Sequence, residues 1–143
     1  MRVVLRGCAI ALLLALSGTA TAQPASLDPA AEMQKQFAEA YNKGDLDAMA
    51  GHFTEDAMRV TPSGIFKGRD AIRRGFQDAL KLGLHDYSVK RVSSRTDGKF
   101  IFNIGEWRAK VGEQPLHGYY TAILVQGDGL PRIMEETVAV AAP

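Results

Sequence analysis

Hydrophobic residues recur at helical spacing in the first half of the chain and alternate with polar residues in much of the rest. Asp28 and Pro29 have the residue types preferred at the N-cap and first turn of a helix. An apolar stripe then follows at intervals of three to four residues and ends before Gly44, a residue type that favours the left-handed conformation at a helix end. The stripe consists of Met33, Phe37, Ala40 and Tyr41. The pattern therefore predicts a helix from Asp28 to about Lys43.

Two further helices are predicted from the same kinds of signal. Asp45 can cap a short second helix, with Leu46, Met49 and Phe53 along one side. Gly68 precedes a third helix over residues 69–82, which ends at a second glycine. Its inward positions are Ile72, Phe76, Ala79 and Leu80.

Strand patterns fill the remainder. Residues 57–61 alternate, with Met58 and Val60 on one face, and after a turn residues 65–68 form a short strand or extended link. Four longer runs, residues 86–95, 99–111, 115–125 and 131–140, are separated by short turns that contain glycine. Strands joined in this way pair as antiparallel neighbours. Three helices followed by these strands predict a single α+β domain over residues 28–143.

The N-terminus is predicted to be a leader and not part of this domain. Arg2 and Arg6 flank an apolar run over residues 8–16, and Ala20-Thr21-Ala22 is a small-residue cleavage pattern. The apolar run is shorter than the ~20 residues that a membrane span needs. We therefore expect a signal peptide over residues 1–22, cleaved after Ala22, a linker over residues 23–27, and a periplasmic or secreted protein without a membrane partner.

Cleavage would leave 121 of the 143 residues, enough for one domain with its own core. The single cysteine, Cys8, would leave with the leader, so a disulfide, a thiol nucleophile and a thiolate metal ligand are excluded from the mature chain. Its net charge is about −1, since two of the 17 basic residues lie in the leader against 16 acidic residues in the domain. No basic run or face indicates a nucleic-acid partner.

The order of elements and three motifs resemble the nuclear transport factor 2-like superfamily, which includes SnoaL-like cyclases, scytalone dehydratase and ketosteroid isomerase. The motifs are "FAEAYNKGDLDAMAGHFTEDAMRV", "GIFKGRDAIRRGF", and the strands ending in "GYYTAILV" and "PRIMEETVAV". The resemblance covers nearly all of residues 28–140. It implies a strongly curved sheet, mixed or antiparallel, that forms a cone with three helices packed on it around an interior pocket.

The resemblance also shows which chemistry this chain lacks. Ketosteroid isomerase uses an aspartate base, with a tyrosine and a protonated aspartate as donors to the oxyanion. Carried over by position, the base falls on Thr61, the tyrosine on Phe37 and the protonated aspartate on Thr121. None of these residues can take the corresponding role. We therefore expect no ketosteroid isomerase activity by that mechanism.

Glu136 is the main candidate for any other catalysis, with Tyr41 or His117 as its partner. Glu136 shares one face of the last strand with Met134, Val138 and Val140, and a carboxylate on such an apolar face would have a raised pKa and could act as an acid or base. Ile133 makes the opposite face partly apolar too, so an exposed Glu136 stays open.

A second ambiguity concerns the strand over residues 99–111. Either Trp107 lines the pocket and Glu106 and Arg108 face outward, or the reverse; we favour Trp107 inward. The full set of predicted pocket residues is Phe37, Tyr41, Phe53, Met58, Val60, Phe76, Trp107, Tyr119, Thr121 and Glu136. The three histidines, His52, His85 and His117, lie on separate elements without metal-ligand spacing, so we predict neither a metal site nor a cofactor.

Three roles remain compatible with the sequence. The favoured one is an exported protein that binds a small, mostly apolar molecule in the cone and pairs as a homodimer through the open sheet face. The second is a SnoaL-like cyclase, dehydratase or isomerase that uses Glu136. The third is an interaction protein whose own side chains fill the cone. The residues alone leave open whether the protein is an enzyme.

Overall fold

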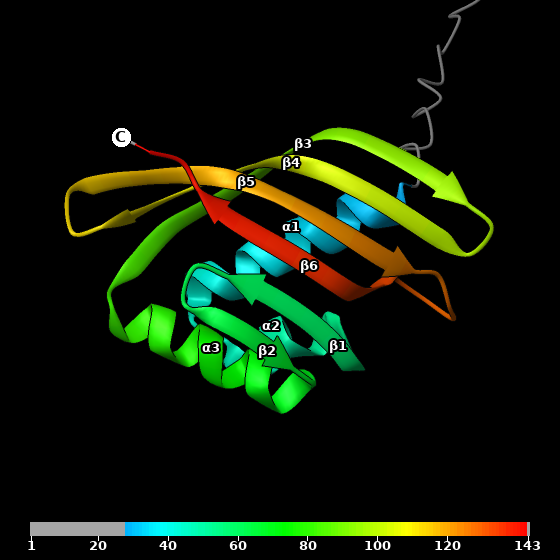
Figure 1. Ribbon diagram of the computed structural model, residues 1–143, viewed down its shortest axis with the longest axis horizontal. Coiled ribbons are helices and arrows are strands. Elements are labelled where there is room, and N and C mark those ends of the chain that lie inside the picture. The colour runs from blue at the N-terminus through cyan, green and yellow to red at the C-terminus, as the bar shows by residue number, and fades with distance from the viewer. Residues whose placement is uncertain (1–27, 143) are drawn as a thin grey trace, which may run out of the picture.

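A computed structural model describes residues 28–142, so the predicted leader and linker lie outside the described residues. Within this range the chain forms three helices and six strands (Figure 1). The helices are α1 (Pro29–Lys43), α2 (Leu46–Gly51) and α3 (Arg69–Lys81). The strands are β1 (Phe53–Thr61), β2 (Gly64–Lys67), β3 (Leu84–Asp97), β4 (Phe100–Val111), β5 (Gln114–Val125) and β6 (Arg132–Val140).

The six strands form one mixed sheet in the order β2-β1-β6-β5-β4-β3. β1 and β6 pair in parallel, and every other neighbouring pair in this sheet is antiparallel. The sheet curves strongly, with the helices on its concave side (Figure 1). The predicted α+β cone, with helices packed on a curved mixed sheet, is confirmed.

The predicted roles of Asp28, Gly44 and Asp45 at the ends of the first two helices are also confirmed. The Asp28 carboxylate accepts hydrogen bonds from the backbone N–H groups of Ala30 and Ala31. Gly44 ends α1 in the left-handed conformation, with φ of 68°. Asp45 then caps α2 by accepting from the backbone N–H of Ala48. The start and end of α1 and the start of α2 are therefore satisfied by the residue types that the sequence places there.

The second helix is shorter than predicted, because Phe53 begins β1 and does not belong to α2. The backbone N–H of Ile133 donates to the His52 carbonyl, and Phe53 lies opposite Ile133 in the parallel pairing of β1 with β6. This pairing with a strand 80 positions later in the chain draws the backbone into the sheet straight after α2. Strand pairing between distant segments overrides the local helical pattern.

Aromatic rings from four elements make the centre of the core between the helices and the sheet. Phe37 on α1 lies 6.3 Å from Phe53 and 5.6 Å from Phe76 on α3, measured between ring centroids. Tyr41 stacks on Tyr87 of β3 with centroids 4.4 Å apart. These contacts fix α1 and α3 against the concave face of the sheet.

The alternation in β4 settles the direction of Trp107. Ile101, Asn103, Gly105, Trp107 and Ala109 are buried on the inner face, whereas Ile104 and Arg108 are exposed on the outer face. Trp107 therefore points into the cone, the alternative that we favoured.

A bulge in β6 explains why the last strand has apolar residues at odd and even positions. Leu124 of β5 lies opposite Ile133 and Ile123 lies opposite Glu135, so Met134 is an extra residue without a partner on β5. An extra residue of this kind shifts the side-chain alternation by one position. Ile133 and Glu136, three residues apart, are consequently both buried on the inner face.

Candidate functional site

The concave face encloses two adjoining cavities. The larger has a volume of about 240 Å³ and is lined mostly by apolar and aromatic side chains from α1, α3 and the sheet. The smaller, of about 20 Å³, lies towards the start of α1 and β4. Four side chains line both cavities and separate them: Phe37, Tyr87, Tyr120 and Glu136.

One ion pair stands in this mainly apolar surface. The Nε of Arg59 on β1 donates to the Glu136 carboxylate on β6 at 2.6 Å, and both side chains are largely buried. The Arg59 guanidinium also lies over the Phe76 ring, 4.4 Å from its centroid. Charges this far from water are kept only when paired, so each of these two residues makes the burial of the other possible.

Strand register brings the polar side chains of the site into one row. Arg59 lies opposite Glu136 across the β1–β6 pairing, Glu136 opposite Ala122 on β5, and Ala122 opposite Asn103 on β4. The row crosses the floor of both cavities. Because Ala122 has only a methyl group, it leaves open space between the Glu136 carboxylate and the Asn103 amide.

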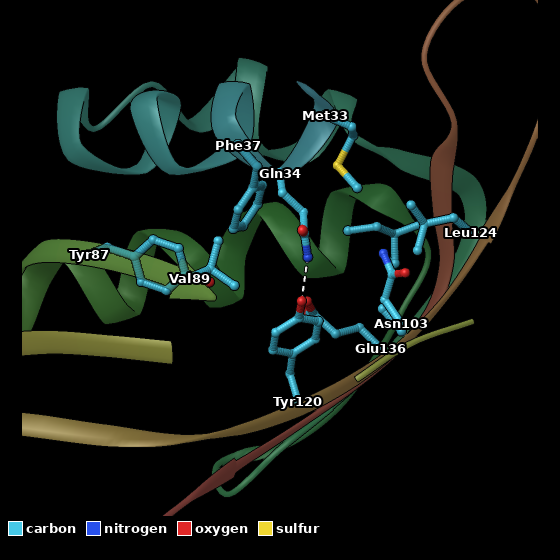
Figure 2. Close-up of a pocket in the computed structure, with 11 residues that line it drawn as sticks. Met33, Gln34, Phe37, Tyr87, Val89, Asn103, Tyr120, Leu124 and Glu136 are labelled. Atoms are coloured by element: carbon cyan, nitrogen blue, oxygen red, sulfur yellow. Dashed lines mark hydrogen bonds between the residues drawn. The ribbon is translucent and has the colours of Figure 1, made fainter. Parts of the chain in front are cut away.

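Tyr120 stands at the boundary between the cavities. Gln34 on α1 donates a hydrogen bond from its side-chain amide to the Tyr120 hydroxyl, as Figure 2 shows. Burial raises the pKa of Tyr120, and the nearby Glu136 carboxylate raises it further against the opposing effect of Gln34. Tyr120 therefore stays protonated and keeps a hydroxyl that both donates and accepts.

Tyr41 and Tyr87 are neutral for the same reason. Burial raises the pKa of the Tyr41 hydroxyl, partly opposed by the Arg59 guanidinium, and burial raises the pKa of Tyr87 far above its ordinary value. Neither phenol can therefore act as a base near neutral pH, although each can donate a hydrogen bond.

Two glycines make room for the large rings on the inner face. A Cβ on Gly118 would lie 2.7 Å from the Nε1 atom of Trp107, and a Cβ on Gly105 would lie 2.5 Å from the Tyr120 ring. Trp107 also donates from Nε1 to the Ala139 carbonyl at 3.1 Å. The two rings lie close to the sheet because the neighbouring strands carry no side chain there.

The sequence matches the model of the SnoaL-like domain family over residues 34–131, more than half of the chain. The chain belongs to the SnoaL-like domain family. It therefore belongs to the nuclear transport factor 2-like superfamily, as its motifs predicted.

Solved structures show the same fold at low sequence identity. This SnoaL-like chain is similar to a nuclear transport factor 2-like protein of unknown function from Shewanella oneidensis, with a TM-score of 0.70, 20% identity, and coverage of 78% of this chain and 97% of that one. It is also similar to a ketosteroid isomerase-like protein from Erwinia carotovora, with a TM-score of 0.70, 13% identity, and coverage of 85% and 100%. No curated protein sequence matches the chain. These likenesses establish the fold alone.

The SnoaL-like cone brings five of the ten predicted pocket residues to the larger cavity. They are Phe37, Tyr41, Phe76, Trp107 and Glu136. Phe53 is fully buried in the aromatic core behind the cavity wall. Thr61, at the position of the isomerase base, also lines the larger cavity.

The structure corrects the placement of the other four predicted pocket residues. Met58 and Val60 lie on the outer face of β1, because Arg59 and Thr61 take the inward positions. Tyr119 and Thr121 lie exposed on the outer face of β5, because Tyr120 and Ala122 point inward. In each strand the prediction chose the wrong one of two alternating faces.

Of the three candidates for acid–base chemistry, the structure brings together two. Glu136 and Tyr41 line the same cavity. His117 is exposed on the outer face of β5 and cannot reach that cavity. Among the described residues, no group of three or more histidine, cysteine, aspartate and glutamate side chains is placed to hold a metal ion.

His52, at the C-terminal end of α2, is partly buried. Its ring packs edge-on against Phe37, with centroids 5.9 Å apart, and burial lowers its pKa. His52 therefore packs against the edge of the aromatic core.

The site residues missed from the sequence include Gln34, Arg59, Tyr87, Asn103 and Tyr120. From the sequence, Arg59 is expected to be solvent-exposed, because Glu136, the partner that allows its burial, is 77 positions later in the chain. Glycines in the middle of the β4 and β5 patterns, Gly105 and Gly118, were the available signal for Tyr120 and Trp107, since a strand glycine often marks a close approach.

Proposed function

We propose that this SnoaL-like protein binds a small, mostly apolar molecule in the larger cavity. The observation that carries the proposal is the cavity itself, whose volume of about 240 Å³ approaches the roughly 300–1,000 Å³ of typical ligand sites. Its wall is mainly aromatic and aliphatic, with one charged pair, Arg59 and Glu136. An interior with such a cavity argues against the role in which the cone is filled by its own side chains.

The charged pair gives the ligand a preferred orientation. Arg59 lines the cavity and uses Nε for Glu136, and a guanidinium has further N–H donors for an acceptor oxygen on a ligand. Tyr41 lines the same cavity as a neutral hydroxyl donor. The apolar body of the ligand would lie against Phe76, Trp107 and their neighbours.

Ketosteroid isomerase activity is not part of the proposal. Phe37 lies in the cavity wall without a hydroxyl, and Thr61 has no carboxylate. Thr121 points away from the cavity on the exposed face of β5. The three groups that the isomerase mechanism needs are therefore missing at the matched positions.

A cavity-filling variant tests the proposal. Ala79 on α3 lines the larger cavity, so Ala79→Phe should fill part of it, whereas Ala48→Phe places the same side chain on the exposed surface of α2. Thermal-shift and native mass-spectrometry screens against apolar metabolites should show ligands that bind the wild type and A48F but bind A79F at least about tenfold more weakly. If no compound binds the wild type, or if A79F binds as well as A48F, the proposal fails.

An enzymatic role is the second candidate, and the burial of Glu136 favours it. Glu136 lines the larger cavity with Tyr41 and the smaller one with Tyr120, so a carboxylate and neutral hydroxyls face the same interior. To act as a base, Glu136 would have to exchange its bond with Arg59 for the substrate. Once a ligand is known, Glu136→Gln should abolish its turnover while leaving its binding within a few-fold. Conversion of the ligand by E136Q at the wild-type rate would exclude this role.

We further propose that the protein is a homodimer through the outer face of the sheet. Ile104 and Tyr119 are more than half exposed on neighbouring strands of that face, and Val92 of β3, next to the residue that pairs with Ile104, is also more than half exposed. Such a cluster is typical of an interaction surface. Light scattering at micromolar concentration should give twice the monomer mass, and a monomer would contradict the proposal.

Export is also a proposal, carried by the leader pattern of residues 1–22. None of the helices in residues 28–142 is long and apolar enough to cross a membrane. Mass spectrometry of the protein from a cell envelope or culture fraction should give an N-terminus at Gln23. An intact Met1 in the cytoplasmic fraction alone would contradict export.

A further inference from the structure

Asn103 is the most unusual polar residue of the interior. It is 1% exposed on the inner face of β4, and neither its Nδ2 nor its Oδ1 atom has a hydrogen-bond partner. Leaving a buried amide unpaired is costly, so nearly all such groups in folded proteins have partners. An amide kept here without one is better explained by a partner that comes from outside the chain.

The smaller cavity lies at this amide. Asn103 lines it together with Gln34, Tyr120 and Glu136, and apolar side chains such as Met33 and Leu124 complete the wall. Figure 2 shows the Asn103 amide and the Gln34–Tyr120 pair facing the same space between α1 and the sheet. Tyr120 and Glu136 also line the larger cavity, so these side chains form part of the boundary between the two spaces.

The size of this space limits what can occupy it. A volume of about 20 Å³ is enough for one group the size of a water molecule. A whole carboxylate or carboxamide is larger than that. An anion would also meet the Oδ1 atom of Asn103 and the Glu136 carboxylate, and both of these repel negative charge.

Hydrogen bonding narrows the choice further. The Nδ2 group of Asn103 needs an acceptor and its Oδ1 atom needs a donor. A ketone or ether oxygen can only accept and would leave Oδ1 unpaired. A neutral hydroxyl both accepts and donates, and it is the size of a water molecule.

We propose that the ligand of this protein is an alcohol or phenol whose hydroxyl group occupies the smaller cavity and pairs with Asn103. This inference rests on the proposed function, since the apolar body of the same ligand would lie in the larger cavity. The hydroxyl would reach Asn103 past Tyr120. Arg59 and Tyr41 would then contact the other end of the ligand.

A matched pair of probes tests the inference. 4-Propylphenol and 1-methyl-4-propylbenzene have nearly the same shape and differ by a hydroxyl in place of a methyl group. Isothermal titration calorimetry of the wild-type protein should show about tenfold tighter binding of the phenol, the effect of one to two added hydrogen bonds. In Asn103→Leu this preference should disappear.

Two controls keep the test decisive. Thr121→Val changes a polar side chain on the outer face of the neighbouring strand and should leave the phenol preference unchanged. If circular dichroism shows that N103L is not folded, Asn103→Ala removes the same two atoms without adding volume and replaces it in the comparison.

The outcomes separate this inference from the proposed function. If both probes bind the wild type equally and N103L changes neither affinity, the protein is a pocket protein and a bound water alone satisfies Asn103, so the inference fails by itself. If neither probe binds the wild type while the apolar screen yields other ligands, the inference fails and the proposed function stands. If the screen yields no ligand either, both fail. A preference for the phenol that N103L removes and T121V keeps supports both.

Discussion

At the scale of single residues, Arg59 and Glu136 show how one pair can shape an interior. Each is a charged side chain on an inner strand face, and their bond of 2.6 Å is made between two largely buried groups. Removing one partner leaves the other charge buried and unpaired. The free-energy cost of that unpaired charge is larger than the cost of losing the hydrogen bond itself.

Substituting one partner should therefore be worse than substituting both. Arg59→Met should lower the free energy of unfolding by about 3–5 kcal/mol, because Glu136 is left buried without its cation. The double variant R59M/E136L should recover most of that loss, since two apolar side chains fill the same space. Urea unfolding followed by circular dichroism measures both values, and equal losses in the single and double variants would show that the charge is not the cause.

Gly118 is a second residue whose substitution should change stability, because there is no room for a Cβ atom at this position. A Cβ there would lie 1.9 Å from the Ala139 carbonyl oxygen, a backbone atom that cannot move aside without disturbing β6. Gly118→Ala should therefore cost about 3 kcal/mol or more in unfolding free energy. Gly127→Ala is the matched control, because nothing lies within 4 Å of the added carbon and its effect should stay within about 0.5 kcal/mol.

At the scale of elements, one contact fastens the start of α1 to β3. Arg91 forms a hydrogen-bonded ion pair with Asp28, the residue that also caps α1. The Arg91 hydrogen bond and the backbone N–H groups of α1 hold the pKa of the Asp28 carboxyl below its usual range. A group with a lowered pKa in the folded state stabilises the protein above its unfolded pKa and loses that effect as the pH falls.

The charge and the cap at Asp28 can be separated. Asn caps helices as well as Asp does, so Asp28→Asn should remove the interaction with Arg91 alone, whereas Asp28→Ala should also lose the cap, at a further cost of about 1 kcal/mol. The stability advantage of wild type over D28N should be complete above pH ~4 and disappear as the pH falls through the lowered folded pKa. Thermal melts at pH 7, 4 and 2.5 measure this, and an advantage that does not shrink between pH 4 and 2.5 would rule out the ionised carboxylate as its source.

The order and type of the elements could be predicted because their signals are local. The caps at Asp28, Gly44 and Asp45 act within one or two turns of the chain, and short turns link consecutive antiparallel strands. The start of β1 could not be predicted in this way, because Phe53 is placed by its pairing with Ile133 near the other end of the chain.

The faces of the strands were harder to predict for related reasons. In β1 the apolar Met58 was placed inside, yet Arg59 points inward because Glu136 on a distant strand neutralises its charge. In β5 Tyr119 and Tyr120 are adjacent and equally aromatic, so alternation alone cannot choose between them. Asn103 carries no sequence signal for its role, since its lack of partners is visible only in three dimensions.

At the scale of the whole molecule, the same sheet has two surfaces with different tasks. The concave surface encloses the cavities, and the outer surface carries exposed apolar residues that we propose for dimerisation. Occupying one surface leaves the other free, so ligand binding and dimerisation can be tested separately.

A charge placed on the outer surface should abolish dimerisation without affecting ligand binding. Ile104 is 53% exposed in the middle of the outer face, and Ile104→Glu should convert the proposed dimer to a monomer at micromolar concentration while ligand binding persists. Leu82→Glu introduces the same charge after α3, away from that face, and should leave the dimer intact. Sedimentation velocity distinguishes these outcomes, and a dimer that survives I104E would place the interface elsewhere.

The unpaired Met134 has a consequence for the permitted length of β6. Deleting Met134 would remove the bulge and leave Ile133, Glu136 and Val138 in regular alternation on the inner face, although the strand would lose its local bend. Deleting Thr137 instead would turn Val138 outward and bring Ala139 to the cavity. Thermal melts of the two shortened chains should therefore differ, with the higher midpoint for the Met134 deletion. The strand can lose one residue at that position and still present the same side chains to a ligand, so insertions and deletions among relatives should gather there.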